Sequence, residues 1–276
     1  MYFKGDFHNH SIESDGNLSP IDVVKRAKSK HIDIMSLTDH DTTDGVLDAI
    51  KEGISLNVKV IPGMELSTSF NNESIHILAY FKDDCYLKEE FQTYLKNLTN
   101  YRVERAKKIV DLLKIHFNIV LDYKNVLKIA EGVVARPHIA KAIMDAGYPY
   151  SIDYIFQNII NEDSPAYIPN KKLTTKDGIS LLKEFNAVVV LAHPVLIKKS
   201  PVEELLKLDF DGIEAIYPLN TKEKTNEYLK LAKKYNKIIT AGSDFHNLNI
   251  GDNKHSDIGT STLDSKNIEI FLNKLL

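Results

Sequence analysis

The feature that most constrains the fold of this chain is a regular alternation of short β-branched runs with amphipathic helical segments. Seven runs are predicted to be strands, and they cover residues 2–8, 32–38, 58–64, 75–81, 187–192, 212–217 and 237–241. Alternating strands and helices predict an α/β fold with a parallel sheet, either open or closed into a barrel. About seven such repeats, without a Gly-rich phosphate motif after the first strand, favour an incomplete TIM-like barrel over a Rossmann sheet.

Helix signals follow most of these runs. Ser19 is suited to a helix N-cap, Pro20 to the first helical position and Asp22 to the first turn. A second amphipathic helix is predicted within residues 221–235, where apolar side chains recur at helical spacing. Both segments place a helix directly after a strand, as a barrel requires.

One connection departs from this alternation of strands and helices. About a hundred residues separate the strand that ends at Phe81 from the next predicted strand, and most of them have a helical pattern. A structureless loop of that length is rare in a compact domain. We therefore expect a barrel domain formed by residues 1–87 and 166–276, with a helical insertion domain of residues 88–165 over one end of the barrel.

The composition narrows the classes of function. Lys and Arg total 35 against 38 Asp and Glu, so the net charge is −3 and does not favour stable binding to duplex nucleic acid. The single cysteine, Cys85, cannot form an intramolecular disulfide, which fits a reducing compartment. The first residues carry no apolar signal segment, and no apolar run has the length of a membrane span. We expect a cytoplasmic protein without a membrane partner.

Metal-capable side chains stand at or near the ends of nearly all the predicted strands. Side chains two residues apart on a strand point to the same face, so a pair such as His8 and His10 directs two groups at one point. Active sites of barrel enzymes form at the C-terminal ends of the strands, where most of these residues fall. The candidate metal ligands are His8, His10, Asp15, His40, Glu65, His76, His193, Asp244 and His246.

The number of candidate ligands is stronger evidence for a metal centre than any single residue. A single histidine at a strand end is more often a hydrogen-bonded structural residue than a ligand, but six of them with three carboxylates predict a metal centre. Nitrogen and oxygen donors without thiolate suit Zn²⁺, Mn²⁺ or Fe²⁺. Nine donors are too many for one ion, so we expect two or three divalent ions per chain. Of the four remaining histidines, His31, His116 and His255 are expected to be surface or structural residues, and His138 belongs to a separate segment.

Eight segments of the sequence follow the motif order of a known family. They are "DFHNHSIESDG", "SLTDHDTTDG", "PGMELST", "IHILAYF", "ARPHIA", "LAHP", "GIEAIYP" and "AGSDFH". They resemble the PHP (polymerase and histidinol phosphatase) superfamily of metal-dependent phosphoesterases. Within it they look like the stand-alone branch with nucleoside 3′,5′-bisphosphate phosphatases and the 5′→3′ exoribonuclease called RNase AM. The resemblance implies a distorted TIM-like (β/α)₇ barrel with a trinuclear metal site at the C-terminal strand ends.

The resemblance also implies how the ligands are shared among three ions. The groups are His8, His10, Glu65 and Asp244 for the first ion, Glu65, His76 and His193 for the second, and Asp15, His40 and His246 for the third. Divalent ions at such a site lower the pKa of a water molecule, which then attacks phosphorus in line. No covalent enzyme intermediate is needed, so no nucleophilic side chain is predicted.

The segment "ARPHIA" supplies candidate catalytic and substrate-binding residues. Arg136 stands before Pro137 at an expected helix start, with the proline at the first helical position and free backbone N–H groups suited to phosphate. A guanidinium group can bind a phosphate with two hydrogen bonds. His138 is expected either to bind substrate or to protonate the leaving oxygen.

Further candidates lie outside that segment. The resemblance points to Arg102 and Arg105 on an insertion helix as substrate-binding residues, although a solvated helix face explains their spacing equally well. Asp39 and Asp41 flank His40 and are expected to support it or to cap local structure rather than to bind a metal. Tyr167 is expected either near a nucleobase or in the core.

Three functions compete at this stage. The leading one is a metal-dependent phosphoesterase for a small phosphorylated substrate, preferably the 3′-phosphate of a nucleoside 3′,5′-bisphosphate, with 5′→3′ trimming of short oligonucleotides as a further activity. The second is a histidinol-phosphate phosphatase with the same chemistry. The third is a metal-stabilised scaffold without turnover, which the complete ligand set and Arg136 argue against. The sequence leaves the metal, the oligomeric state and the exact substrate open.

Overall fold

The chain folds around one nearly closed sheet. The computed structural model describes residues 2–130, 134–169, 173–247 and 256–276, so His255 lies outside the described residues. The described strands are ordered β8-β7-β6-β4-β3-β2-β1-β9 along the sheet, and β5 pairs beside β3. They are β1 (Lys4–Asp6), β2 (Ile34–Leu37), β3 (Lys59–Phe70), β4 (Glu73–Phe81), β5 (Leu173–Thr174), β6 (Ala187–Leu191), β7 (Gly212–Ile216), β8 (Ile238–Ala241) and β9 (Leu263–Asp264). All seven predicted strands are present, and the short β5 and β9 are additional.

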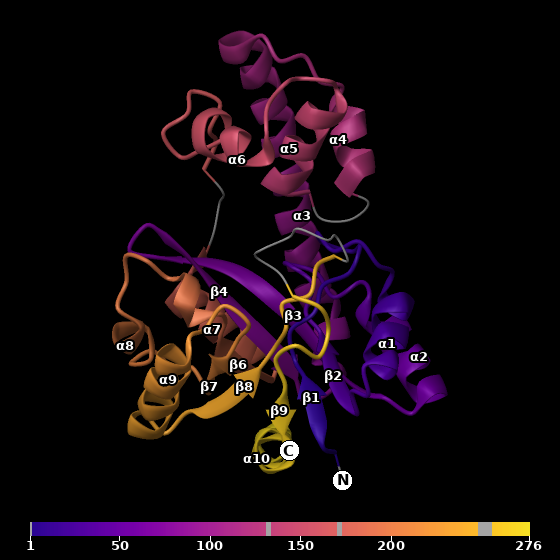
Figure 1. Ribbon diagram of the computed structural model, residues 1–276, viewed down its shortest axis with the longest axis vertical. Helices are drawn as coiled ribbons and strands as arrows, with labels where there is room; N and C mark the ends of the chain where they lie inside the picture. The colour runs from indigo at the N-terminus through magenta and orange to yellow at the C-terminus, as the bar shows by residue number, and fades with distance from the viewer. Residues whose placement is uncertain (1, 131–133, 170–172, 248–255) are drawn as a thin grey trace.

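Backbone contacts bring the two sides of the sheet together. The Phe7 N–H group, just after β1, donates to the Ala241 carbonyl group at the end of β8 (3.0 Å). Beyond this point Asn9 and Phe245 form an isolated parallel bridge. The sheet therefore closes into a distorted barrel, as the sequence predicted (Figure 1).

The prediction of a wholly parallel sheet is wrong at β4. β1, β2 and β3 are parallel neighbours, and so are β6, β7 and β8, but β4 runs antiparallel to both β3 and β6. β3 and β4 are joined by Asn71 and Asn72, which both have positive φ angles (49° and 58°). Two such residues form the tight turn of a hairpin, which forces the next strand to reverse. The short β9 is also antiparallel, to β1.

Helices pack around the outside of the barrel (Figure 1). They are α1 (Pro20–Ser29), α2 (Val46–Leu56), α7 (Thr175–Glu184), α8 (Val202–Leu205), α9 (Lys222–Lys234) and α10 (Ser265–Leu275), with the 3₁₀ turn η3 (Pro194–Leu196) after β6. The predicted cap of α1 is confirmed, because the Ser19 side chain accepts a hydrogen bond from the Asp22 N–H group. The helix predicted within 221–235 is α9, and Thr221 caps it.

The strand side chains alternate between two hydrophobic layers. On β6, Val188 and Val190 belong to an inner cluster with Phe7 and Tyr80, while the residues between them pack outward against the helices. This period of two is what a strand buried on both faces requires. The inner cluster fills the barrel below the C-terminal strand ends, and Phe271 of α10 joins it from the C-terminal helix. The polar residues at the strand ends therefore lie directly above a packed hydrophobic core.

A second group of helices lies above the barrel (Figure 1). After the turn η1 (Asp84–Leu87), whose Tyr86 packs in the barrel cluster, its elements are α3 (Glu89–Phe117), α4 (Tyr123–Ala130), α5 (Arg136–Asp145), α6 (Ile152–Tyr154) and η2 (Ile155–Ile159). These helices share a hydrophobic cluster of their own, which includes Leu113 and Ile143. α3 joins the two parts, because Phe91 near its start packs in the barrel cluster. The separate clusters support the proposed insertion domain of residues 88–165.

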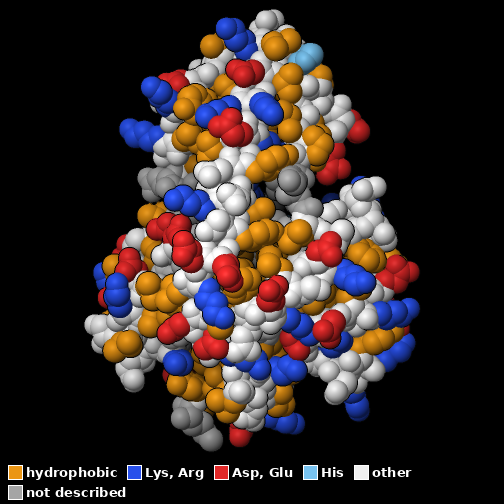
Figure 2. Space-filling model, turned by 180° about the vertical axis from the view of Figure 1, so that it is seen from behind, with side chains coloured by type: hydrophobic (Ala, Val, Ile, Leu, Met, Phe, Trp, Pro, Cys, Tyr) orange, Lys and Arg blue, Asp and Glu red, His pale blue; other side chains and the backbone are white. Residues whose placement is uncertain are grey.

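The surface carries both signs of charge. Figure 2 shows acidic and basic side chains interspersed over the back of the barrel and of the insertion, in keeping with the net charge of −3. That face therefore has no continuous basic stripe of the kind that binds a phosphate backbone. In the described ranges, no helix is long and apolar enough to span a bilayer.

Candidate metal centre and substrate cavity

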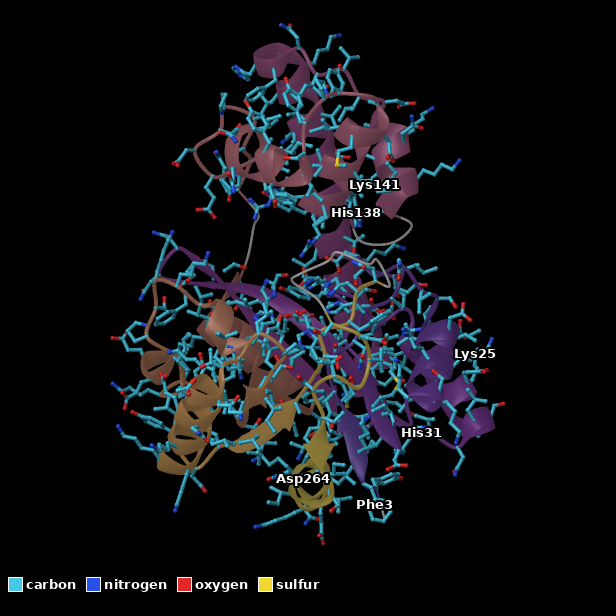
Figure 3. The ribbon with its side chains drawn as sticks, in the orientation of Figure 1. Phe3, Lys25, His31, His138, Lys141 and Asp264 are labelled. Carbon is cyan, nitrogen blue, oxygen red and sulfur yellow. The ribbon has the colours of Figure 1, made fainter. Side chains whose placement is uncertain are left out.

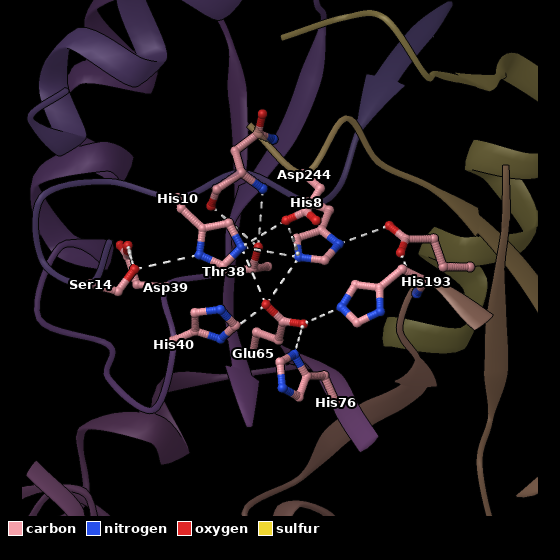
Figure 4. Close-up of polar contacts among 12 residues, drawn as sticks. His8, His10, Ser14, Thr38, Asp39, His40, Glu65, His76, His193 and Asp244 are labelled. Atoms are coloured by element: carbon pink, nitrogen blue, oxygen red, sulfur yellow. Dashed lines mark hydrogen bonds and ion pairs between the residues drawn. The ribbon is translucent and has the colours of Figure 1, made fainter. Parts of the chain in front are cut away.

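The nine predicted ligands converge at one end of the barrel, and Figure 4 shows all of them except Asp15 and His246. His8 and His10 follow β1, His40 follows β2 and His193 follows β6, while Asp244 and His246 follow β8. Glu65 lies within β3, and Asp15 comes from the loop after β1. His76 lies near the start of β4, and because β4 runs antiparallel, its start meets the C-terminal ends of the parallel strands. The reversal of β4 therefore keeps its histidine at the candidate site.

The first group contains His8, His10, Glu65 and Asp244, all buried. The Nε2 atoms of His8 and His10 lie 3.1 Å apart, and each lies 3.2 Å from Glu65 Oε2 and from Asp244 Oδ1. Donors about 2.1 Å from a tetrahedral ion are roughly 3.4 Å apart, so this spacing fits a shared divalent cation. The group has the composition that the family resemblance implies for the first ion.

Glu65 connects this group to a second one. Its Oε1 atom lies 2.9 Å from His76 Nδ1 and 2.9 Å from His193 Nε2. On the other oxygen, His40 Nδ1 lies 3.1 Å from Glu65 Oε2, yet among the described residues it has no hydrogen-bond partner. A buried imidazole nitrogen directed at a carboxylate without a hydrogen bond is typical of a metal ligand. One carboxylate with imidazole groups on both oxygens has the geometry of a bridge.

Asp15 is the centre of a third group. His246 Nε2 lies 3.2 Å from Asp15 Oδ1, and His40 Nε2 lies 3.9 Å from Asp15 Oδ2. His10 also belongs here, with Nδ1 3.8 Å from Asp15 Oδ1, although the sequence assigned it only to the first group. His10 and His40 thus lie between groups, and the division among three ions stays a prediction.

The carboxylates of the cluster are held in the charged state. Burial alone would raise the pKa of Glu65, but the surrounding imidazole groups hold it well below its ordinary value. The pKa values of Asp15 and Asp244 are lowered well below their ordinary range in the same way. Burial lowers the pKa of His40 to about 3, which keeps this ring neutral with a lone pair to share. Charged carboxylates and a neutral imidazole are the protonation states that metal ligands require.

The same carboxylates attract positive charge onto the first two histidines. Burial would lower the pKa of His10, but hydrogen bonds and attraction from Asp244 and Glu65 raise it to about 10. The pKa of His8 is also raised, because Glu214, Asp244 and Glu65 together outweigh its burial. A divalent cation bound between these side chains would supply the positive charge that the carboxylates attract. The donor set therefore fits a metal-binding role.

Asp39 supports the loop that carries Asp15. Its carboxylate accepts hydrogen bonds from the Ser11 N–H group (2.7 Å), the Ser11 hydroxyl group (2.7 Å) and the Ser14 hydroxyl group (2.6 Å). Ser14 Oγ in turn lies 3.4 Å from His10 Nδ1 (Figure 4). Asp39 therefore holds the first loop against the end of β2, which agrees with the supporting role predicted for it.

The sequence reading gave no role to two residues near the cluster. Glu214 Oε1 lies 3.0 Å from His8 Nδ1, and the Tyr217 hydroxyl group donates to Asp244 Oδ2 at 2.8 Å. Both belong to the segment "GIEAIYP", where a carboxylate and a phenol interrupt an otherwise apolar strand. A charged residue inside a buried strand is the signal that could have identified Glu214, because it needs a partner in the interior.

A cavity of about 640 Å³ adjoins the cluster, and its walls come from both parts of the chain. This volume lies within the usual range for sites that bind small molecules. The barrel contributes candidate metal ligands and the polar tip of the β3–β4 hairpin, and the insertion contributes three arginine residues. The lining residues are Asp15, His40, Ser67, Ser69, Asn72, Glu73, Ser74, His76, Arg102, Arg105, Ala135, Arg136, Pro137, Phe156, Glu162, Tyr167 and Pro169.

Arg105 and Arg136 form a positive region in this wall. Arg105 Nε donates to the Ile168 carbonyl group at 2.6 Å, and its guanidinium carbon lies 6.0 Å from the centre of the Tyr167 ring. Burial and repulsion by Arg136 lower the pKa of Arg105 to about 10. Among the described residues, neither arginine forms an ion pair with a carboxylate. The two charges are therefore suited to an anionic ligand.

Arg102 differs from the other two arginines. Its Nη2 atom donates to Asp41 Oδ2 and to Ser67 Oγ, the latter at 3.1 Å. Asp41 also accepts a hydrogen bond from the Ser67 N–H group at 2.7 Å. Arg102 therefore ties α3 to the barrel beside His40, while its side chain still lines the cavity. The solvated-face alternative for Arg102 and Arg105 is wrong, because both side chains are largely buried.

His138 lies on the side of the insertion that faces the barrel (Figure 3). The Ala135 N–H group donates to His138 Nδ1 at 3.0 Å, which caps the start of α5. Burial lowers the pKa of His138. α5 begins at Arg136, so Pro137 occupies the second helical position rather than the predicted first one.

Comparisons with known proteins agree with this geometry. A family model described as "PHP domain" matches residues 6–245. A 5′-3′ exoribonuclease from Haemophilus influenzae is 28% identical over 253 residues, which cover 89% of this chain and 91% of that protein. A 3′,5′-nucleoside bisphosphate phosphatase from Chromobacterium violaceum is 25% identical over 250 residues, 87% of this chain and 86% of its own length.

The fold has a counterpart among solved structures. A crystal structure of a protein from Bifidobacterium adolescentis superposes with a TM-score of 0.83 at 24% identity, and the match covers 98% of this chain and 96% of that one. The range of the family match includes eight of the nine candidate ligands, and His246 lies one residue beyond it. The chain therefore belongs to the PHP domain family, and it is a metal-dependent phosphoesterase.

Proposed function

We propose that this phosphoesterase removes the 3′-phosphate of nucleoside 3′,5′-bisphosphates, with trimming of short oligonucleotides from the 5′ end as a related activity. The observation that carries the proposal is one cavity with two regions for anions. One region is the candidate metal cluster, and the other is the pair Arg105 and Arg136, whose charges meet no described carboxylate. A substrate with two phosphate groups on one sugar engages both regions, whereas a monophosphate engages only one.

Two relatives support the choice of a nucleotide. One is named as a 3′,5′-nucleoside bisphosphate phosphatase and the other as a 5′-3′ exoribonuclease. A nucleoside 3′,5′-bisphosphate and each linked nucleotide inside an RNA strand both carry a phosphoryl group on the 3′ oxygen and another on the 5′ oxygen. We propose that Arg105 and Arg136 bind the 5′-phosphate and that Tyr167, held beside Arg105, contacts the nucleoside. The same arrangement serves a nucleotide or the first residue of a short strand.

Two or three ions of Mn²⁺, Zn²⁺ or Fe²⁺ are proposed for the cluster, and when bound they supply an activated water and neutralise charge on the phosphoryl oxygens. The residues of the chain hold this arrangement in place. Glu65 would hold ions through both of its oxygens, and the carboxylates of Asp15, Glu65 and Asp244 would balance the cationic charge. The cytoplasmic location expected from the single cysteine stays a prediction.

His138 is better suited to binding than to proton transfer. Because its Nδ1 atom accepts the Ala135 N–H group, the neutral ring carries its hydrogen on Nε2. Its lowered pKa keeps it neutral near pH 7, so the Nε2–H group donates a hydrogen bond but is a weak acid. Of the two roles left open by the sequence, we propose substrate binding.

The test is phosphate release from adenosine 3′,5′-bisphosphate with added Mn²⁺, measured against 3′-AMP, which lacks the 5′-phosphate. We expect kcat/KM for the bisphosphate to exceed that for 3′-AMP by about 100-fold, because a hydrogen bond to a charged group contributes about 1.5–3 kcal/mol. Asp244→Ala should abolish both activities. Arg136→Gln should reduce the ratio between the two substrates about 10-fold or more through KM for the bisphosphate, because it removes one of the two guanidinium groups.

Two outcomes would contradict the proposal. Equal kcat/KM values for the two substrates would show that the arginine pair does not bind a 5′-phosphate. Faster hydrolysis of histidinol phosphate than of any nucleotide would assign the same chemistry to the alternative substrate. Products from a 5′-phosphorylated oligonucleotide, sampled over time, would show whether the chain releases single nucleotides from a strand.

A further inference from the structure

A buried carboxylate outside the predicted ligand set touches two candidate ligands at once. Glu214 lies in the middle of β7, and its side chain is fully buried. Its neighbours Ile213 and Ala215 face the outer hydrophobic cluster, so the alternation of the strand turns Glu214 into the barrel interior. A charged carboxylate in that position is costly unless it has strong partners. Among the described residues it has no lysine or arginine partner.

The first partner is the ring of His8. Glu214 Oε1 lies 3.0 Å from His8 Nδ1, and a carboxylate accepts, so His8 Nδ1 carries the hydrogen. The Nε2 atom of His8 then presents its lone pair toward Glu65 Oε2 and Asp244 Oδ1, both 3.2 Å away. A carboxylate behind a histidine fixes the tautomer and the orientation of the ring and makes it a more basic ligand.

The second partner is the backbone of His193. Glu214 Oε2 accepts a hydrogen bond from the His193 N–H group at 2.7 Å. His193 has a positive φ angle of 26°, a conformation that a residue with a side chain adopts only when its surroundings hold it. Its Nε2 atom lies 2.9 Å from Glu65 Oε1. One carboxylate therefore places ligands on both oxygens of the proposed bridge.

The contact between Glu214 and His8 leaves no space for a side chain at the neighbouring Gly242. A methyl group at Gly242, just after β8, would collide with His8 Cβ and lie 2.5 Å from Glu214 Oε1. Gly242 does not have a positive φ angle, so its backbone conformation alone does not require glycine. The close approach of Glu214 to His8 gives a reason for glycine at this position.

We propose that Glu214 is a positioning residue of the metal centre. It sets the tautomer of His8, holds the strained backbone of His193 and so fixes one donor on each side of Glu65. The proposal rests on the metal-binding part of the proposed function and is independent of the substrate. It predicts an effect on metal affinity that a residue needed only for folding would not have.

The test measures Mn²⁺ binding to chelator-treated protein by calorimetry, with Glu214→Gln as the variant. Glutamine keeps the shape of the side chain but loses the charge, and its NH₂ group cannot accept a hydrogen bond. We expect at least one Mn²⁺ ion to bind about 10- to 100-fold more weakly, the usual effect of changing the partner of a metal-binding histidine. The melting temperature without metal should be unchanged or higher, because a buried charge has been removed.

Glu203→Gln is the matched control. It removes one carboxylate charge at an exposed position, where Glu203 pairs with Lys234, and it should bind Mn²⁺ like the wild type. Mn²⁺ affinity of Glu214→Gln equal to that of the control would overturn the proposal. A lower melting temperature with unchanged affinity would assign Glu214 a purely structural role. Wild-type protein that binds no divalent cation would overturn the metal centre itself.

A second measurement needs no variant. In ¹⁵N-histidine-labelled wild-type protein loaded with diamagnetic Zn²⁺, the His8 ring should carry its hydrogen on Nδ1, which NMR correlations within the ring report directly. A hydrogen on Nε2 would contradict the proposal, since Glu214 would then have no donor from this ring.

Discussion

At the scale of single residues, the hydroxyl group of Tyr217 contacts one of the candidate metal ligands. The residue is buried beside the cluster, and its hydroxyl group donates to Asp244 Oδ2 at 2.8 Å, opposite the oxygen that faces His8 and His10. Its ring also contacts His193, with ring centres 5.8 Å apart. Burial and the charge of Asp244 raise the pKa of Tyr217, so it stays a neutral donor at any physiological pH.

Tyr217→Phe should therefore weaken metal binding, while the retained aromatic ring should preserve the packing of the core. We expect the Mn²⁺ concentration for half-maximal activity to rise about 10-fold, because Asp244 loses a partner that orients it. Tyr235→Phe is the control, since the Tyr235 hydroxyl group donates to the surface residue Glu203. Metal dependence that is the same in the two variants would show that the phenol does not orient Asp244.

At the scale of elements, α1 is tied to the strand end that carries Asp244. Arg26 of α1 donates two hydrogen bonds to Asp257, Nε to Oδ1 at 2.6 Å and Nη2 to Oδ2 at 2.8 Å. Lys30 lies 2.6 Å from the same carboxylate. The Arg26 guanidinium group also stands 5.9 Å from the ring centre of Phe245. One bidentate ion pair therefore joins α1 to a residue 231 positions later in the chain, and the same guanidinium group reaches the residue that follows Asp244.

Asp257→Asn should lower the free energy of unfolding by about 0.5–1 kcal/mol at pH 7, a value reduced by the partial exposure of the pair. Burial would raise the pKa of Asp257, but Arg26 and Lys30 lower it below its ordinary value. A lowered pKa in the folded state gives stability that is present above the unfolded pKa and lost as the pH falls through the folded one. The difference between wild type and variant should therefore shrink below about pH 4.

Urea unfolding at pH 7, 5 and 3 measures this difference. Asp48→Asn is a suitable control, because in the part of the chain that the structure describes Asp48 pairs with Lys51 alone, at an exposed position on α2. A gap between wild type and Asp257→Asn that persists at pH 3 would show that charge is not the source of the stability.

At the scale of the whole molecule, the candidate functional residues are divided between two parts of the chain, each with its own hydrophobic cluster. All nine candidate ligands lie in the barrel, while Arg105, Arg136 and His138 lie in the insertion, which packs around its own cluster. α3 crosses from one unit to the other, and the Arg102–Asp41 pair fixes it beside the metal cluster. Metal binding and phosphate binding are therefore expected to respond to different core substitutions.

Ile143→Ala tests this division. Ile143 is fully buried in the insertion cluster. Truncating its side chain to alanine should lower the free energy of unfolding by about 2–5 kcal/mol. We expect the variant to raise KM for the bisphosphate while its Mn²⁺ content stays that of the wild type. Leu78→Ala, at a fully buried position inside the barrel, is the comparison and should reduce Mn²⁺ content. Equal losses of metal in the two variants would show that the two units unfold together.

The sequence predicted the strands and the candidate ligands because both are local properties. Strand periodicity is visible within a few residues, and the identity of a donor such as Glu65 or Asp244 does not depend on the fold. The position of each donor at a strand end then follows from the sheet. The reversal of β4 was missed, because two asparagine residues at 71 and 72 are a weak signal until their positive φ angles are seen.

Other features depend on residues far apart in the chain, and only the tertiary structure decided them. Glu214 and His8 are 206 positions apart, and Arg102 and Asp41 are 61 apart, so no local pattern pairs them. The sequence determined which chemical groups the protein has and which strand ends carry them. The fold decided which carboxylate contacts which candidate ligand, and which of the cavity arginine residues pairs with a carboxylate, because those outcomes depend on burial and distance.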